Sequence, residues 1–279
     1  MKAAVLNKPI LLFGVFAGLF LAAITTAVLY DSYYLVGIPF GILLLYAGWL
    51  RPSLVFYGLL FSLPLSFEYN FSTTLGTDIP DEFLMLFTSG LFLVYALYNR
   101  KAISHEIRSH PLIFLLTILF SWMLVAILFS THPLISVKYG LAKTWYLGAF
   151  VLAPLLVFTN KPSIRKAALL LAGSMLLITM IALVRHGLTG FSFATVNDAV
   201  SPFFRNHVNY SAMLVCMIPL WIAFYYLAKK QAHRRWIGIV ILISIAALFF
   251  SYARGAWLAL LTGGVAFLLI RKRKLVSDQ

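Results

Sequence analysis

The chain has 279 residues, of which 62% are hydrophobic and only 11% charged, with a formal net charge of +14. A soluble globular domain is closer to half apolar and a quarter charged, so the composition excludes such a domain and predicts an integral membrane protein. The positive charge does not predict nucleic-acid binding, because basic residues that flank membrane spans give the same sum. The single cysteine, Cys216, excludes a disulfide framework and a multi-cysteine metal site.

Apolar stretches follow one another along almost the whole chain. A transmembrane helix needs roughly 20 apolar residues to cross a ~30 Å hydrocarbon core, and fewer where anchoring side chains flank it. We therefore predict an all-α, polytopic membrane protein with about ten transmembrane helices in one helical domain over 1–279. The predicted spans are 10–29, 34–50, 52–66, 80–98, 111–129, 144–159, 165–184, 209–228, 236–251 and 255–270.

The charges of the loops predict the orientation of these spans. With the N-terminus in the cytoplasm, 17 of the 22 Lys and Arg residues fall in alternate segments, namely 1–9, 51, 99–110, 160–166, 229–235 and 271–279. Six of the eight acidic residues fall on the other side, with five basic residues: Lys138, Lys143, Arg185, Arg205 and Arg254. Because cytoplasmic loops carry an excess of Lys and Arg, we expect both termini to be cytoplasmic.

Arg254 interrupts an otherwise apolar stretch, "LFFSYARGAWLALL" (248–261). A continuous helix over Trp236–Ile270 would be about 52 Å long, more than one crossing needs. The stretch therefore predicts a helical hairpin with Ser251–Gly255 as its outer turn, where Gly255 would allow the bend. Arg254 then lies at the outer surface, either as a functional residue or as a side chain that merely extends to the interface.

The segment 185–208 is predicted to be an extracytoplasmic loop, because glycines and Asn-Asp and Ser-Pro pairs punctuate it. It ends in Arg205-Asn206-His207, directly before a predicted span that Asn209 or Ser211 would cap. An arginine, a histidine and a helix N-terminus together favour an anion site. The alternative is that Arg205 pairs with Asp198 and that His207 only caps or packs.

Other polar residues on the predicted outer side have a structural explanation. Asp78, Asp81 and Glu82 are expected to be a solvated loop followed by carboxylates that favour a helix N-terminus, although such a cluster could also hold a divalent ion or act as a base. Asp31 is expected to be a turn residue. His132 and Lys138 lie in a predicted outer loop and could contribute to the anion site. No constellation of metal ligands is apparent in the sequence.

Two short segments, "FFRNHVNYSAML" (203–214) and "SYARGAWLALL" (251–261), resemble the O-antigen ligase and O-antigen polymerase family. Their order and predicted side agree with that family, of which "FSLPLSFEYN" followed by a polar loop and another span is also typical. These bacterial inner-membrane enzymes transfer glycan from undecaprenyl diphosphate to a lipid or saccharide acceptor. The resemblance covers most of the chain as topology, but only the first two segments carry it residue by residue.

The resemblance implies a metal-independent membrane glycosyltransferase without a cofactor, which acts in lipopolysaccharide or other cell-envelope polysaccharide synthesis at the outer face of the inner membrane. Its partners would be an undecaprenyl-diphosphate-linked glycan, a lipid or saccharide acceptor and membrane lipids, with no nucleic acid. Arg205 and Arg254 would bind the donor diphosphate and stabilise its developing charge. With His207 they are the predicted catalytic residues, and Lys138 and Asn206 are predicted to contribute to substrate binding.

Family members usually continue through a further span and a long outer loop, whose histidine is proposed to activate the acceptor hydroxyl, whereas this chain stops at "RKRKLVSDQ". We therefore expect either a fragment or shortened product, or a chain in which His207 or an acidic residue replaces that histidine. Two other functions stay open. A transporter or flippase would also place arginines near lipid phosphates, though it predicts internal repeats or mid-membrane charges. A non-catalytic scaffold of a polysaccharide assembly system is the third possibility.

Overall fold

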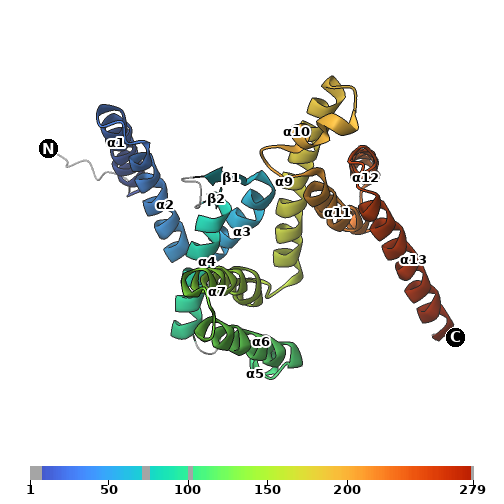
Figure 1. Ribbon diagram of the computed structural model, residues 1–279, viewed down its shortest axis with the longest axis horizontal. Coiled ribbons are helices and arrows are strands. Elements are labelled where there is room, and N and C mark those ends of the chain that lie inside the picture. The colour runs from blue at the N-terminus through green and yellow to red at the C-terminus, as the bar shows by residue number, and fades with distance from the viewer. Residues whose placement is uncertain (1–7, 71–75, 100–102, 278–279) are drawn as a thin grey trace. The chain divides into compact units, whose positions relative to one another are not determined.

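The computed structural model describes residues 8–70, 76–99 and 103–277, and this part of the chain is mostly helical (Figure 1). Lys2, Arg100 and Lys101, which the charge argument uses, lie outside the described residues. The α-helices are α1 (Lys8–Leu29), α2 (Gly37–Leu50), α3 (Pro52–Ser62), α4 (Asp81–Tyr98), α5 (His105–Arg108), α6 (Pro111–Leu128), α7 (Pro133–Leu147), α8 (Ala153–Val157), α9 (Lys161–Leu188), α10 (Val196–Val200), α11 (His207–Leu227), α12 (Gln231–Phe250) and α13 (Arg254–Ser277).

Short elements complete the described chain. The 3₁₀ turns are η1 (Tyr33–Val36), η2 (Leu63–Leu65) and η4 (Phe193–Thr195), the π-helical turn η3 is Gly148–Leu152, and the strands are β1 (Phe67–Asn70) and β2 (Gly76–Ile79). The two antiparallel strands form a hairpin in a segment that was predicted to be an outer loop. The rest of the described chain is mostly helical, which agrees with the predicted all-α class. Asp31 has a left-handed φ of 49° in the turn after α1, which confirms it as a turn residue.

The protein is a multi-pass membrane protein. Among the described residues, seven helical segments are long and apolar enough to cross a membrane: α1, α4, α6, α7 through α8, α9, α11 and α12. Helix α6 shows why lipid must be their solvent, because its 18 residues include no charge and none is buried. Helices α2, α3 and α13 are shorter apolar helices, so the count of ten spans and the cytoplasmic termini stay predictions.

Several helices begin earlier in the sequence than predicted. The span predicted over 144–159 belongs to a helix that begins at Pro133, whose ring fixes a helical φ at the first helical position. Lys138 and Lys143 are therefore helical rather than in a loop. Helix α9 also begins earlier than predicted, because the Asn160 side chain accepts a hydrogen bond from the Ser163 N–H at 2.9 Å and caps it.

The contact pattern divides the chain into two units, Met1–Phe56 and Tyr57–Gln279, and the second contains every predicted site residue. The core of the second unit lies between α9, α10, α11 and α12 and includes Met175, Leu214 and Ile218. Small buried residues, such as Ala172 and Ala247, let these helices approach closely, as is usual in membranes. A smaller cluster joins α3, α4 and η3 through Leu59, Met85 and Ala149.

Candidate functional site

The predicted 185–208 loop is mostly built from helical turns. Helix α9 continues to Leu188, and η4 and α10 follow before the chain reaches α11. Arg185, in the last turn of α9, braces this segment by donating hydrogen bonds to the carbonyl oxygens of Ser201 and, at 2.8 Å, Asp198. The segment is therefore a folded cover at the start of α11 and not an open loop.

Helix α11 begins at His207, two residues before the predicted start. Asn206 has extended backbone angles, and its Oδ1 accepts a hydrogen bond from the Asn209 N–H at 2.9 Å. Asn206 is therefore the N-cap, in place of Asn209 or Ser211, which were predicted for this role. The cap fixes the point at which α11 begins and therefore where its free N–H groups and partial positive charge lie.

The His207 side chain is held by Asn197 of α10. The Oδ1 atom of Asn197 lies 2.9 Å from the His207 backbone N and 2.8 Å from its Nδ1. Because an amide oxygen only accepts, this network assigns the proton to Nδ1. On the other side of the ring, Nε2 forms no hydrogen bond within the part of the chain that the structure describes.

Arg254 begins α13, directly after the turn Ser251–Ala253. The helix–turn–helix is thus confirmed, but the residue that makes the bend is Tyr252, with a left-handed φ of 58°, and not Gly255. The Tyr252 hydroxyl donates to the Phe191 carbonyl oxygen at 2.6 Å, and the Trp257 Nε1 donates to the Leu248 carbonyl oxygen at 2.7 Å. These bonds fix the turn against the folded 185–208 segment and against the end of α12.

A hollow of about 620 Å³, here the α11–α13 hollow, brings His207 and Arg254 together. Its walls come from positions between 207 and 215 of α11 and between 252 and 259 at the start of α13. His207, Tyr252 and Arg254 lie at the end where both helices begin, and small apolar residues such as Ala212 and Ala259 line the remainder. No described Asp or Glu lines this hollow, so its electrostatic potential favours an anion.

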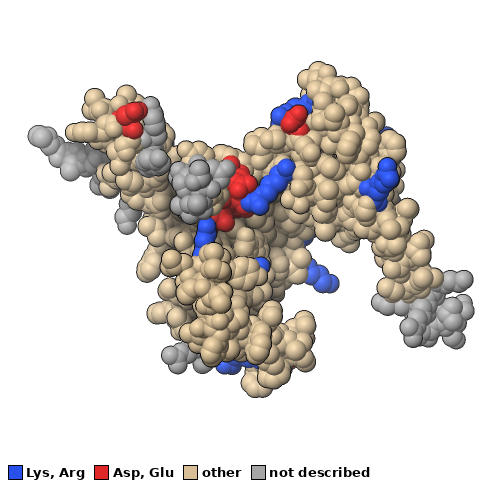
Figure 2. Space-filling view, in the orientation of Figure 1, with Lys and Arg blue, Asp and Glu red and all other residues tan. Residues whose placement is uncertain are grey.

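Arg205 lies elsewhere, in a hollow of about 350 Å³ next to the β1–β2 hairpin. Its Nε is 3.0 Å from the Oε2 of Glu68, so the predicted alternative pairing with Asp198 is not formed. Figure 2 shows acidic and basic side chains in contact over the hairpin. This hairpin hollow is lined by Glu68, Asp78, Asp81, Tyr146, Arg205 and Asn209, with Leu63, Ser66 and residues 202–204.

The carboxylates make the hairpin hollow a poor place for a phosphate. Burial raises the pKa of the Asp78 carboxyl above its ordinary value; the charge of Arg205 opposes this rise, and Glu82 and Glu68 add to it. Asp81, in the first turn of α4, accepts a hydrogen bond from the Ser66 hydroxyl at 2.6 Å. The expected solvated loop is thus a half-buried strand, and Asp81 and Glu82 lie in the first turn of α4, where their carboxylates favour the helix N-terminus. Among the described residues, no group of three His, Cys, Asp or Glu side chains is arranged to hold a metal ion.

Lys138 and His132 are not brought into either hollow by any described contact. Lys138 is exposed on α7, and His132 is exposed just before Pro133, where its backbone N–H donates to the Ser130 Oγ at 3.1 Å. Within the described residues, no ion pair or hydrogen bond joins either side chain to Arg205 or Arg254. Of the predicted site residues, the structure therefore brings together His207 and Arg254 and places Asn206 at the start of α11. It leaves Arg205 in the hairpin hollow and Lys138 apart from both hollows.

The sequence reasoning missed His186. This histidine is only 4% exposed, its Nε2 lies 2.9 Å from the Ser192 carbonyl oxygen, and its ring meets Phe191 and Tyr252 edge to face. It supports the segment that holds Tyr252. Little in the sequence indicates this role, because the contact with Tyr252 joins residues that are distant in the sequence.

The comparisons with known proteins find nothing similar: no family model, no curated protein and no solved structure matches the chain. The α11–α13 hollow and the hairpin hollow must therefore be interpreted from their own chemistry.

Proposed function

We propose that the protein transfers glycan from an undecaprenyl-diphosphate-linked donor to a lipid or saccharide acceptor at the outer face of a bacterial inner membrane, as an enzyme of the O-antigen ligase and polymerase type. The observation that carries the proposal is the α11–α13 hollow, where His207 and Arg254 meet at the starts of two helices above a wall of small apolar residues. This arrangement suits a ligand with a diphosphate head and an apolar chain.

Arg254 is the residue that we assign to the diphosphate. A guanidinium binds phosphate oxygens bidentately, and here the first amides of α11 and α13 add partial positive charge at the same end of the hollow. When the bond between the anomeric carbon and the diphosphate breaks, the electron pair leaves with the diphosphate. Arg254 then stabilises the negative charge that develops, without a metal ion.

His207 is the residue that we assign to the acceptor. Its Nδ1–H is held by Asn197, so Nε2 is available to take the proton of the acceptor hydroxyl as that oxygen bonds to the anomeric carbon. Arg205 has a different part in this scheme. Because Glu68 already neutralises it, Arg205 ties the segment before α11 to the β1–β2 hairpin and positions the start of the helix.

Release of undecaprenyl diphosphate from a lipid-linked oligosaccharide is the test, because every transfer yields this product whatever the acceptor. Proteoliposomes that contain the chain, the donor and a lipid extract of the source cells are expected to release it. Arg254→Ala should reduce the rate at least 100-fold, a typical effect of removing a group that stabilises transition-state charge. His207→Gln should reduce the rate while donor binding is retained, and the exposed Lys143→Ala should be unaffected.

The same assay separates the alternatives. Movement of the intact donor across the bilayer, without release of undecaprenyl diphosphate, would contradict transfer and indicate a flippase. A scaffold would neither move the donor nor release undecaprenyl diphosphate. In that case, the wild-type and Arg254→Ala proteins would support polysaccharide assembly equally well.

A further inference from the structure

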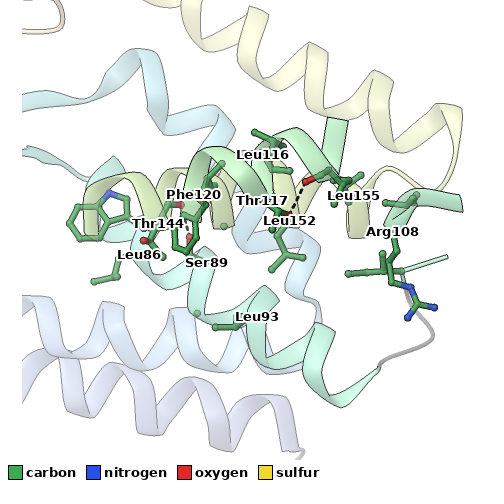
Figure 3. Close-up of a pocket in the computed structure, with 18 of the residues that line it drawn as sticks. Leu86, Ser89, Leu93, Arg108, Leu116, Thr117, Phe120, Thr144, Leu152 and Leu155 are labelled. Atoms are coloured by element: carbon green, nitrogen blue, oxygen red, sulfur yellow. Dashed lines mark hydrogen bonds between the residues drawn. The ribbon is translucent and has the colours of Figure 1, made fainter. Parts of the chain in front are cut away.

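A third hollow is larger than the α11–α13 hollow and the hairpin hollow and shares no lining residue with either of them. It has a volume of about 720 Å³ and is lined by positions 86–93 of α4, 103–108 in and before α5, 113–120 of α6 and 141–155 of α7 through α8. Figure 3 shows Ser89 and Thr144 toward one end and Arg108 at the other, with leucine side chains between them. We call this the lipid groove.

The wall of the lipid groove offers an occupant almost no hydrogen bonding. The hydroxyls of Ser89, Thr117 and Thr144 donate to the carbonyl oxygens of Trp145, Ile113 and Gly140, at 2.6, 2.9 and 2.8 Å. The indole N–H of Trp145 has no described partner, but it is buried within the wall. An apolar chain therefore fits the groove, and a polar ligand does not.

Arg108 gives the otherwise apolar lipid groove one charged end. Its side chain is exposed, and in Figure 3 its guanidinium points away from the leucines. Among the described residues it forms no ion pair. An arginine at the mouth of an apolar groove is complementary to a molecule with a phosphate at one end and a hydrocarbon chain behind it.

The length of the groove agrees with one leaflet of a bilayer. Positions 141–155 extend along about 21 Å of helix at 1.5 Å per residue, and positions 113–120 along about 10 Å. Half of a ~30 Å hydrocarbon core is about 15 Å. The groove is thus long enough for the chain of one lipid whose phosphate stays at the surface beside Arg108.

We propose that the lipid groove is a binding site for an anionic phospholipid, with one acyl chain along α4, α6 and α7 and its phosphate on Arg108. This site is separate from the α11–α13 hollow and does not depend on the proposed glycan transfer. Arg108 belongs to the segment 99–110, which the charge distribution predicts to be cytoplasmic. We therefore assign the lipid to the cytoplasmic leaflet.

Gly90 allows a direct test, because it lines the groove and a Cβ added there meets no atom within 4 Å. The full chain in detergent is titrated with dioleoyl-phosphatidylglycerol or dioleoyl-phosphatidylcholine, and bound lipids are counted by native mass spectrometry. We expect one phosphatidylglycerol to bind more tightly than the rest. Gly90→Phe should weaken it at least tenfold, and Arg108→Ala about fivefold, as expected for one cation near an anionic lipid.

Two matched controls show whether the effects are local. Gly173→Phe adds the same ring at another helical glycine with open space, and Arg235→Ala removes an exposed arginine outside the groove. Both should bind phosphatidylglycerol as the wild type does. Equal binding of the two phospholipids, full retention by Gly90→Phe, or a clear preference for undecaprenyl phosphate in a competition titration would overturn the proposal.

Discussion

Tyr252 is the residue on which the position of Arg254 depends. A left-handed φ costs a non-glycine residue about 1–2 kcal/mol, so something must hold Tyr252 at its φ of 58°. Its hydroxyl bond to the Phe191 carbonyl oxygen and its ring contacts with Phe193 and His186 do so. The sequence could predict a bend near Gly255, but not that an aromatic residue makes it, because its partners are about sixty positions away.

Tyr252→Phe tests this support, since it removes the hydroxyl and keeps the ring. We expect a loss of about 1 kcal/mol in the free energy of unfolding, the usual net value of one hydrogen bond. The measurement is denaturant unfolding in detergent, with the exposed Tyr98→Phe as the control. An equal stability of the two variants would show that the turn does not need the Phe191 bond.

At the scale of elements, the lengths of the apolar stretches predicted the helices well, whereas the structure of the polar segments was predicted poorly. Helices such as α4, α6 and α12 follow from runs of apolar residues, which lipid solvates on every exposed side. The start of α11 was misplaced because Asn206, Asn209 and Ser211 are all capable caps, and only the backbone angles of Asn206 decide between them. The β1–β2 hairpin was missed because its strands are only four residues each.

The hairpin makes a pH-dependent contribution through Asp78. Since the pKa of Asp78 is raised in the folded protein, the folded state binds its proton more readily than the unfolded state. Asp78 therefore lowers stability as pH rises through the raised pKa, and this cost is absent below the ordinary carboxyl value. Asp78→Asn should raise the unfolding temperature at pH 7 and lose that advantage at acidic pH. An Asn variant that is less stable at pH 7 would contradict this.

At the scale of the whole molecule, the candidate site unites two segments that are far apart in the sequence. The pairing of α11 with α12 returns the chain to the same end, so that Arg254 begins α13 near the start of α11. The charge pattern predicts that this end is extracytoplasmic. His207 and Arg254 line one hollow there, whereas the sequence predicted one site that also included Arg205. It could not predict that Arg205 faces the other hollow, because Glu68 comes from a hairpin that the sequence did not reveal.

Cysteine labelling tests the orientation. In a Cys216→Ala background, a membrane-impermeant maleimide on intact cells should label Ala194→Cys, which lies in the covering segment and is exposed. It should label Lys229→Cys, between α11 and α12, only after the membrane is permeabilised. Labelling of both positions from the same side would show that α11 does not cross the membrane.

The central claim is that the α11–α13 hollow binds a lipid-linked diphosphate through Arg254. The most direct test is to measure the equilibrium binding of radiolabelled undecaprenyl diphosphate to the chain in nanodiscs. We predict that Arg254→Ala weakens binding about 10- to 100-fold, as expected for the loss of a hydrogen-bonded charge, while Arg254→Lys retains part of the affinity and Lys138→Ala retains all of it. Equal affinity of the wild-type and Arg254→Ala proteins would contradict the assignment of the hollow.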